Sequence, residues 1–403
     1  MTDIPQPVPD EHRQESNSLT TIRIRQGWVI CIGFSLLFTL RKVYPEYRQV
    51  IYLLPYISLV FGILNSILLR KILFDKKMVL GFVIYVVAVI LSIYSLDQMT
   101  FFSYRDFLII SAVFLTFIPV ISITDKMVKI LFIVFLINTF IGVTFKGVYS
   151  LNVKSYLVDS NALLENDAFQ FALFTLYFIY RKDYKWAAIS LLMNGIVFKR
   201  IAFFALLSSL GTYLYMFGFN NKKYLDKKLL GKSLLMAFAY TLVLYIIAMN
   251  IAYIARYVLD YFQYYDISTD YFLKGRIAIQ SELNRIIAST GLYQTLFGHG
   301  IGAADSTLQL IALIFDNPHN DFLKLQFEYG IVGLVLYVTA IWLILSRNCF
   351  GILVFVFSMT LLPTDNTIIY ITYQFLAVFL VKCISTEMIS PGEHQQEKSI
   401  GSV

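Results

Sequence analysis

The sequence has little charge and little cysteine. Of its 403 residues only 15% are Asp, Glu, Lys or Arg, and it holds three cysteines and four histidines. So few charges exclude an ordinary soluble domain, in which about a quarter of the residues are charged. Cys31, Cys349 and Cys383 lie in or beside apolar runs, which excludes a disulfide framework and is typical of small buried hydrophobic residues. The few histidines form no cluster with useful ligand spacing, so no metal site is expected.

What the chain has instead is apolar length. Hydrophobic residues make up 58% of it, and its mean hydropathy is +0.68. Apolar runs that approach the roughly 20 residues needed to cross a bilayer predict membrane-spanning helices. We expect an all-α polytopic membrane bundle of about twelve transmembrane helices, near 27–40, 50–69, 78–96, 107–123, 128–145, 168–180, 186–198, 201–219, 229–254, 322–345, 349–362 and 368–383.

Basic residues give the expected orientation. They concentrate in alternate short loops, which the positive-inside rule assigns to the cytoplasm. The net charge of +7 therefore reflects topology, and nucleic-acid binding is excluded. We expect cytoplasmic tails at 1–26 and 385–403, one transmembrane domain at 27–384, and one large outer loop at 255–318.

That outer loop contains its own helical pattern. Ile279, Leu283, Ile286 and Ile287 recur at helical spacing. The pattern predicts an amphipathic helix lying on the outer membrane surface.

The most informative polar residues precede an apolar run near the end of the chain. Asn317 and Pro318 resemble a helix cap and first helical residue. A helix starting there would carry His319, Gly330 and Gly333 on one face, with the glycines admitting a neighbouring helix. The histidine would lie at the positive helix end, where anions such as phosphate bind. The alternative is an interfacial capping histidine with glycines used only for packing.

Other charges interrupt apolar runs. Lys199 and Arg200 separate two runs on the outer side, as snorkelling cations at a tight turn or as donors to a lipid-linked phosphate. Lys324 and Glu328 are four residues apart and can neutralise each other inside the bundle.

A resemblance to a known family rests on spacing. His319 and Asn320 are followed by nine residues, Gly330, two residues and Gly333. This pattern resembles the O-antigen polymerase and O-antigen ligase superfamily of bacterial inner membranes. The segment GRIAIQSELNRIIASTGLYQTLFGHGIG, 275–302, is similar to that family's arginine-led outer-loop helix and places its arginine at Arg276.

A second arginine also fits the resemblance. Arg200, followed by IAFFALL, is similar to the family's earlier arginine at the outer end of a span. Two positions depart from the family: Lys199 replaces the serine that usually precedes this arginine, and Gln280 stands where many members carry tryptophan.

The resemblance implies an enzyme with a fold like that of C-type glycosyltransferases. It would transfer a glycan from an undecaprenyl-diphosphate-linked oligosaccharide at the periplasmic face, with no cofactor, nucleotide sugar or metal. His319 would take a proton from the acceptor hydroxyl or only orient a substrate, and the arginines would stabilise the departing diphosphate. The candidate residues are His319, Arg276 and Arg200 for catalysis, Lys199, Asn320 and Arg285 for substrate binding, and Gly330 and Gly333 for structure.

Three functions follow as alternatives. We favour a polymerase that joins repeat units, over a ligase that moves finished glycan onto lipid A core. A transporter is the third, and it predicts paired discontinuous spans and ionisable groups near the membrane midplane. The resemblance further implies an inner-membrane location, contact with the lipid bilayer, and a flippase and a chain-length regulator as candidate partners.

Overall fold

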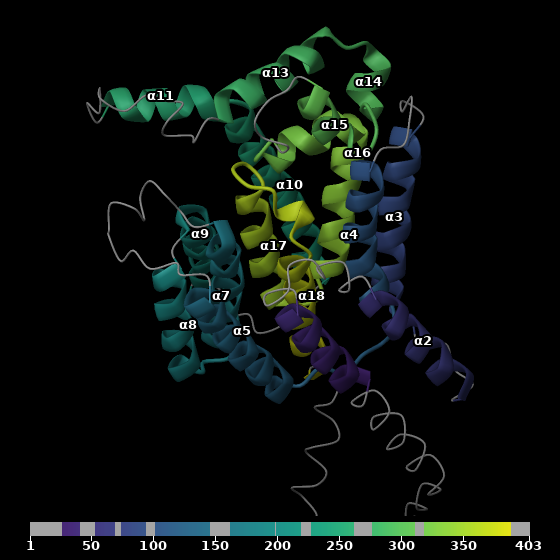
Figure 1. Ribbon diagram of the computed structural model, residues 1–403, viewed down its shortest axis with the longest axis vertical. Coiled ribbons are helices and arrows are strands. Elements are labelled where there is room, and N and C mark those ends of the chain that lie inside the picture. Colours follow the sequence, from purple (N-terminus) through teal and green to yellow (C-terminus); the bar gives the residue numbers. More distant parts are fainter. Residues whose placement is uncertain are drawn as a thin grey trace, which may run out of the picture. The chain divides into compact units, whose positions relative to one another are not determined.

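The computed structural model describes residues 26–40, 53–68, 74–93, 101–145, 162–197, 199–218, 227–261, 276–310 and 318–387 (Figure 1). These residues form α-helices, with one short 3-10 helix and an isolated β-bridge between Phe74 and Pro119. The predicted all-α class is therefore confirmed. Nearly all of both predicted tails lies outside the described residues.

The described residues contain fewer clear membrane spans than the twelve predicted for the chain. Among the described residues, α3 (Lys76–Ile93) and α16 (Asp321–Leu345) are long and apolar enough to cross a membrane. The pair α10 (Lys227–Met249) and α11 (Ile251–Tyr261), bent by 73°, would make a third span. Several shorter helices are apolar, so the fold is compatible with a membrane protein, but a bundle of twelve spans is not confirmed.

The contacts divide the chain into two compact units, one of residues 1–76, 115–141 and 382–403, the other of 77–114 and 142–381. In the first unit, helix Gln26–Leu40 packs along α5 (Asp125–Phe145). Phe38 stacks on Phe135 with ring centroids 4.1 Å apart.

The same unit contains α2 (Leu53–Leu68), which packs against the segment after α4 (Phe101–Phe117). A Cβ at Gly62 would lie 2.6 Å from Pro119, so the small glycine permits this contact. The buried ammonium of Lys382 donates to the Phe117 carbonyl at 2.5 Å, which keeps that cation satisfied away from water.

The second unit contains a helical hairpin of α7 (Ala162–Tyr180) and α8 (Tyr184–Val197). Next in the chain, α9 (Arg200–Gly218) packs on α7 and on α17 (Cys349–Leu361). The Ser209 hydroxyl donates to the Leu353 carbonyl at 3.1 Å across the α9–α17 contact.

In the same unit α10 lies against α16 and α17. The Tyr245 hydroxyl donates to Gln326 at 2.8 Å, and the Tyr240 and Thr360 hydroxyls are 2.6 Å apart. The chain then turns through the 3-10 helix η2 (Thr367–Ile369) into α18 (Ile371–Glu387).

The predicted amphipathic helix exists as α13 (Arg276–Ser289). Its apolar face packs on α16 and on α15 (Ala303–Leu310). The apolar cluster consists of Ile279, Leu283, Ala304, Leu308, Leu323 and Phe327, with Ile286 and Ile287 partly buried beside it. The predicted helical periodicity is therefore present, and most of its apolar residues pack on protein.

The start of α16 differs from the prediction. Asn320 is the cap, since its side-chain oxygen accepts from the Leu323 N–H at 3.1 Å, and the helix begins at Asp321. Asn317 lies outside the described residues, and Pro318 precedes the helix. His319 has a φ of 50°, a left-handed conformation that few non-glycine residues adopt, and so it is not on the helical face assigned to it.

A break at Gly330 also divides that face. Gly330 has a φ of 67°, and a Cβ there would lie 2.3 Å from the backbone of Leu296, at the end of α14 (Leu292–Phe297). The Phe327 and Glu328 carbonyls accept instead from the backbone N–H groups of His299 and Gly300, at 2.8 and 2.9 Å. Gly330 therefore allows a kink in α16, and the turn of residues 298–302 inserts at this kink.

The turn that fills the kink is GHGIG, 298–302, whose glycines have positive φ at 298, 300 and 302. The imidazole of His299, in this turn, stacks on the Phe327 ring with centroids 4.5 Å apart. Burial lowers the pKa of His299. The glycine-rich pattern thus serves close backbone contact with α16.

Candidate functional site

The site begins at His319, directly before the N-terminus of α16. Because His319 is left-handed and Asn320 caps the helix, the imidazole lies by the α17–α18 connection. The Asn366 amide nitrogen is 3.1 Å from the imidazole Nδ1. This contact joins the predicted histidine to a residue that the sequence did not single out.

The α17–α18 connection, residues 362–370, is held by buried carboxylates. Asp365 accepts from the Asn366 N–H at 2.8 Å and from the Tyr370 hydroxyl at 2.9 Å. From α16, Asp321 accepts from the Thr367 hydroxyl and the Ile368 N–H, both at 3.0 Å. Carboxylates bound in this way fix the loop that carries Asn366.

Lys199 reaches the same loop from the start of α9. Its ammonium forms an ion pair with Asp365, and its side chain is 12% exposed against 1% for that carboxylate. The ammonium also lies 4.6 Å from the centre of the Phe169 ring, in a cation–π contact. Arg200 is the next residue, is exposed, and opens α9.

The structure therefore brings together part of the predicted set. His319, Asn320 and Lys199 all neighbour the 362–370 loop, through direct contacts or through the chain. The Asn320 side chain also serves the fold, since its amide donates to the Ala248 carbonyl at 3.0 Å. This use leaves it less suited to substrate than the prediction implied.

The remaining predicted residues are placed differently. Arg276 is the first residue of α13, and its side chain lies outside the described part of the chain. Arg285 is exposed and pairs with Glu282 one turn earlier, at 2.5 Å. Its hydrogen bond lowers the pKa of the Glu282 carboxyl. A Cβ at Gly333 would lie 2.4 Å from the Tyr329 side chain, in keeping with a structural role.

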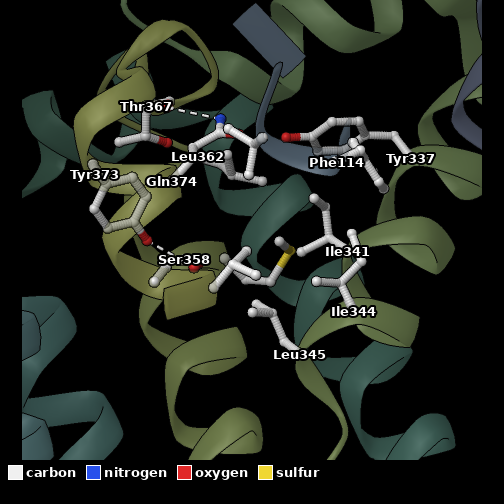
Figure 2. A pocket seen from close by; sticks show the side chains of 14 residues that line it. Phe114, Tyr337, Ile341, Ile344, Leu345, Ser358, Leu362, Thr367, Tyr373 and Gln374 are labelled. Atoms are coloured by element: carbon white, nitrogen blue, oxygen red, sulfur yellow. Dashed lines mark hydrogen bonds between the residues drawn. The ribbon is translucent and has the colours of Figure 1, made fainter. Parts of the chain in front are cut away.

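Beneath the 362–370 loop is a small cavity of about 40 Å³, lined by α4, α16, α17 and α18 (Figure 2). Its wall is mostly apolar, with hydrogen bonds between Tyr373 and Ser358 at 2.7 Å and from Gln374 to the Thr367 carbonyl at 3.1 Å. Ligand pockets for small molecules measure roughly 300–1,000 Å³. The cavity is too small for a sugar ring, so a glycan would bind elsewhere.

A second polar cluster lies inside the same unit, where α4, α15 and α16 meet. The Lys324 ammonium is 2.7 Å from Asp106, 2.9 Å from Asp305 and 3.7 Å from Glu328. Arg105 pairs with Asp106 at 2.7 Å and also with Asp305. The predicted pairing of Lys324 with Glu328 is present, within a larger set of buried charges.

This ion cluster joins α15 to two long helices, α4 and α16. Lys324 is 2% exposed, and the three carboxylates at 106, 305 and 328 are 2% exposed or less. Removing one partner from such a buried pair costs about 3–5 kcal/mol, because the other charge is left uncompensated. We interpret the cluster as the anchor that fixes α15 against α4 and α16.

Sequence reasoning missed the acidic and amide partners at both places. Asp365 and Asn366 lie in the short polar segment between two apolar runs, and a polar segment on the same side as His319 was the available signal. Asp106 and Asp305 had no such signal, because the cation that they share with Glu328, Lys324, lies on a different helix from both.

No protein-family model matches this chain, and no curated protein matches its sequence. Any function therefore has to be inferred from the residues themselves and from their contacts.

Proposed function

We propose that this protein is a membrane glycosyltransferase that joins lipid-linked oligosaccharide repeat units, an O-antigen type polymerase of the bacterial inner membrane. The observation that carries the proposal is the meeting of His319 and Lys199 at the 362–370 loop, with Arg200 beside it. The resemblance selects His319 and Arg200, which come from separate segments of the chain, whereas Lys199 departs from the family pattern. The proposed donor is an undecaprenyl-diphosphate-linked glycan.

Glycosyl transfer from a lipid-linked donor needs only a few protein side chains. The bond between the sugar C1 and the diphosphate oxygen breaks, and the diphosphate leaves with the electron pair. The acceptor hydroxyl oxygen bonds to C1 and loses its proton. A guanidinium offers forked donors to the departing diphosphate, and this role suits Arg200 together with Arg276, which the resemblance supplies. Arg200 follows Lys199 in the chain, and Lys199 pairs with Asp365 in the loop that also contacts His319.

The charge distribution supports an outer-face reaction over transport. A transporter would hold ionisable groups midway along its spans. The buried charges of α16, Lys324 and Glu328, instead occupy the first third of that helix, near the end that follows His319. The ligase alternative uses the same chemistry with another acceptor, so only an assay separates it.

The test uses the full-length protein, purified in detergent and given undecaprenyl-diphosphate-linked repeat units. We expect lipid-linked products that grow by whole repeats. The His319→Ala variant should lose activity by roughly 100-fold or more, in line with the loss of a positioned catalytic group. Lys129→Gln, at a partly exposed pair in α5, is the control and should keep full activity.

Two outcomes contradict the polymerase. Absence of longer products from repeat units alone, with transfer only when lipid A core is added, would assign the ligase reaction. Uptake of the substrate into protein-containing vesicles without any new glycan would assign transport.

A further inference from the structure

Contacts on two sides set the position of His319. On one side, Asn320 caps α16, and the left-handed backbone of His319 directs its side chain towards the 362–370 loop. On the other side the partner, Asn366, is 1% exposed. The imidazole and the amide thus meet within the folded protein.

The backbone that carries Asn366 is held in place. The backbone N–H of Asn366 donates to the Asp365 carboxylate at 2.8 Å, and that carboxylate is bound by Tyr370 and Lys199. The next residue, Thr367, donates to Asp321 at 3.0 Å. The loop therefore places the Asn366 side chain against the imidazole Nδ1.

The chemistry of that contact fixes a proton. An amide nitrogen has hydrogens and no lone pair to offer, so it can only donate. If it donates to Nδ1, that nitrogen is unprotonated, and the neutral imidazole carries its hydrogen on Nε2. The Asn366 Oδ1 has no hydrogen-bond partner among the described residues. The reverse amide orientation would instead bury an NH₂ group without a partner, which is the rarer situation.

We infer that Asn366 is a positioning residue, whose amide nitrogen against Nδ1 holds neutral His319 in its Nε2–H form and makes it a hydrogen-bond donor to the diphosphate of the lipid-linked donor. The tautomer rests on this contact together with the orientation of the amide, whereas the diphosphate contact rests on the proposed function. This settles a choice that the resemblance leaves open, between a base and an orienting group. The acceptor hydroxyl then passes its proton to the departing diphosphate or to water.

The tautomer is measured directly by ¹⁵N NMR of histidine-labelled, full-length protein in detergent. The chain has four histidines, and a His319→Gln spectrum assigns the signals of His319 by their loss. Charged groups that contact the same loop are Asp321 and the Lys199–Asp365 pair, and Arg200 follows Lys199 in the chain. The spectrum is therefore recorded at rising pH until the imidazole is neutral.

We expect the neutral form to show a protonated Nε2 and an unprotonated Nδ1. In Asn366→Asp a carboxylate replaces the donor, so the proton should move to Nδ1 and both ¹⁵N signals should shift. Asn250→Asp, at an exposed asparagine, is the matched control and should leave them unchanged. A protonated Nδ1 in the unmodified protein would overturn the inference, and this result does not depend on whether Asn366→Asp folds.

Two substitutions test the donor role. Glutamine places an amide nitrogen near the position of Nε2, and asparagine places one near Nδ1. In the polymer assay, His319→Gln should retain about tenfold more activity than His319→Asn, because only glutamine keeps a donor to a charged group. Equal loss in both variants would contradict the donor role and assign a base.

The two proposals fail separately. If the Nε2–H form is observed but no glycan is transferred from lipid-linked repeat units, the positioning by Asn366 stands, while the diphosphate contact and the proposed function are both wrong. If glycan is transferred but the imidazole carries its hydrogen on Nδ1, the function stands and the role of Asn366 is wrong.

Discussion

The charge of Lys199 can serve one of two roles: it can neutralise a carboxylate of the protein, or it can bind a charged substrate. Its ammonium is paired with Asp365, a carboxylate that is 1% exposed and that also holds the loop of Asn366. A lysine that compensates a buried carboxylate has less charge to offer an incoming diphosphate. The contacts therefore favour a positioning role for Lys199 over the substrate-binding role that we predicted from the sequence.

A double-mutant cycle separates these roles. Lys199→Met should lower the free energy of unfolding by roughly 2–4 kcal/mol, because Asp365 is left buried without its cation. Adding Asp365→Asn removes the uncompensated charge and should restore most of the stability and of the transfer activity. Thermal unfolding and the polymer assay measure both. Recovery of stability without recovery of activity would show instead that Lys199 binds the substrate.

At the scale of the element, the kink in α16 depends on one backbone angle. Gly330→Ala forces a side chain into a left-handed conformation and places its Cβ against Leu296, which we expect to cost roughly 2–5 kcal/mol. Gly195→Ala in α8 is the control, since no atom lies within 4 Å of its added Cβ. It should be neutral or stabilise by about 0.5–1 kcal/mol. Equal unfolding temperatures for the two variants would contradict the packing argument.

The same helix shows what sequence can predict and where it stops. The apolar run, the charged pair of Lys324 and Glu328, and the importance of Gly330 were all predicted. The cap and the kink were not, because Asn317 and Asn320 are equally good caps in sequence, and a glycine on a helical face looks the same as a glycine that breaks it.

The site shows the same limit. His319 was found from local spacing, whereas Asn366 contacts it only because α17 returns the chain to the start of α16. Such a contact has no local signature. The charged partners Asp106 and Asp305 were missed for the same reason, since each lies on a different helix from Lys324.

For the whole molecule, helix direction predicts which segments share a side of the membrane. In the larger unit, α16 leads away from His319 and α17 returns to Asn366, so these two residues belong to one side. Lys199 joins them through Asp365. The 14 residues of α8 extend over about 21 Å and separate Lys199 from the turn that precedes α8. That turn is rich in basic residues, which the positive-inside rule assigns to the cytoplasm.

Labelling of single cysteines tests this topology in a background from which the three native cysteines are removed. Lys185→Cys, exposed at the start of α8, should react with an impermeant maleimide only in inside-out membrane vesicles. Ser289→Cys, exposed at the end of α13, should react only in spheroplasts. If both cysteines react from the same side, the predicted topology is wrong, and if Ser289→Cys reacts only in inside-out vesicles, a site at His319 that opens to the outer face is ruled out. Opposite reactivity places His319 where a lipid-linked glycan is presented.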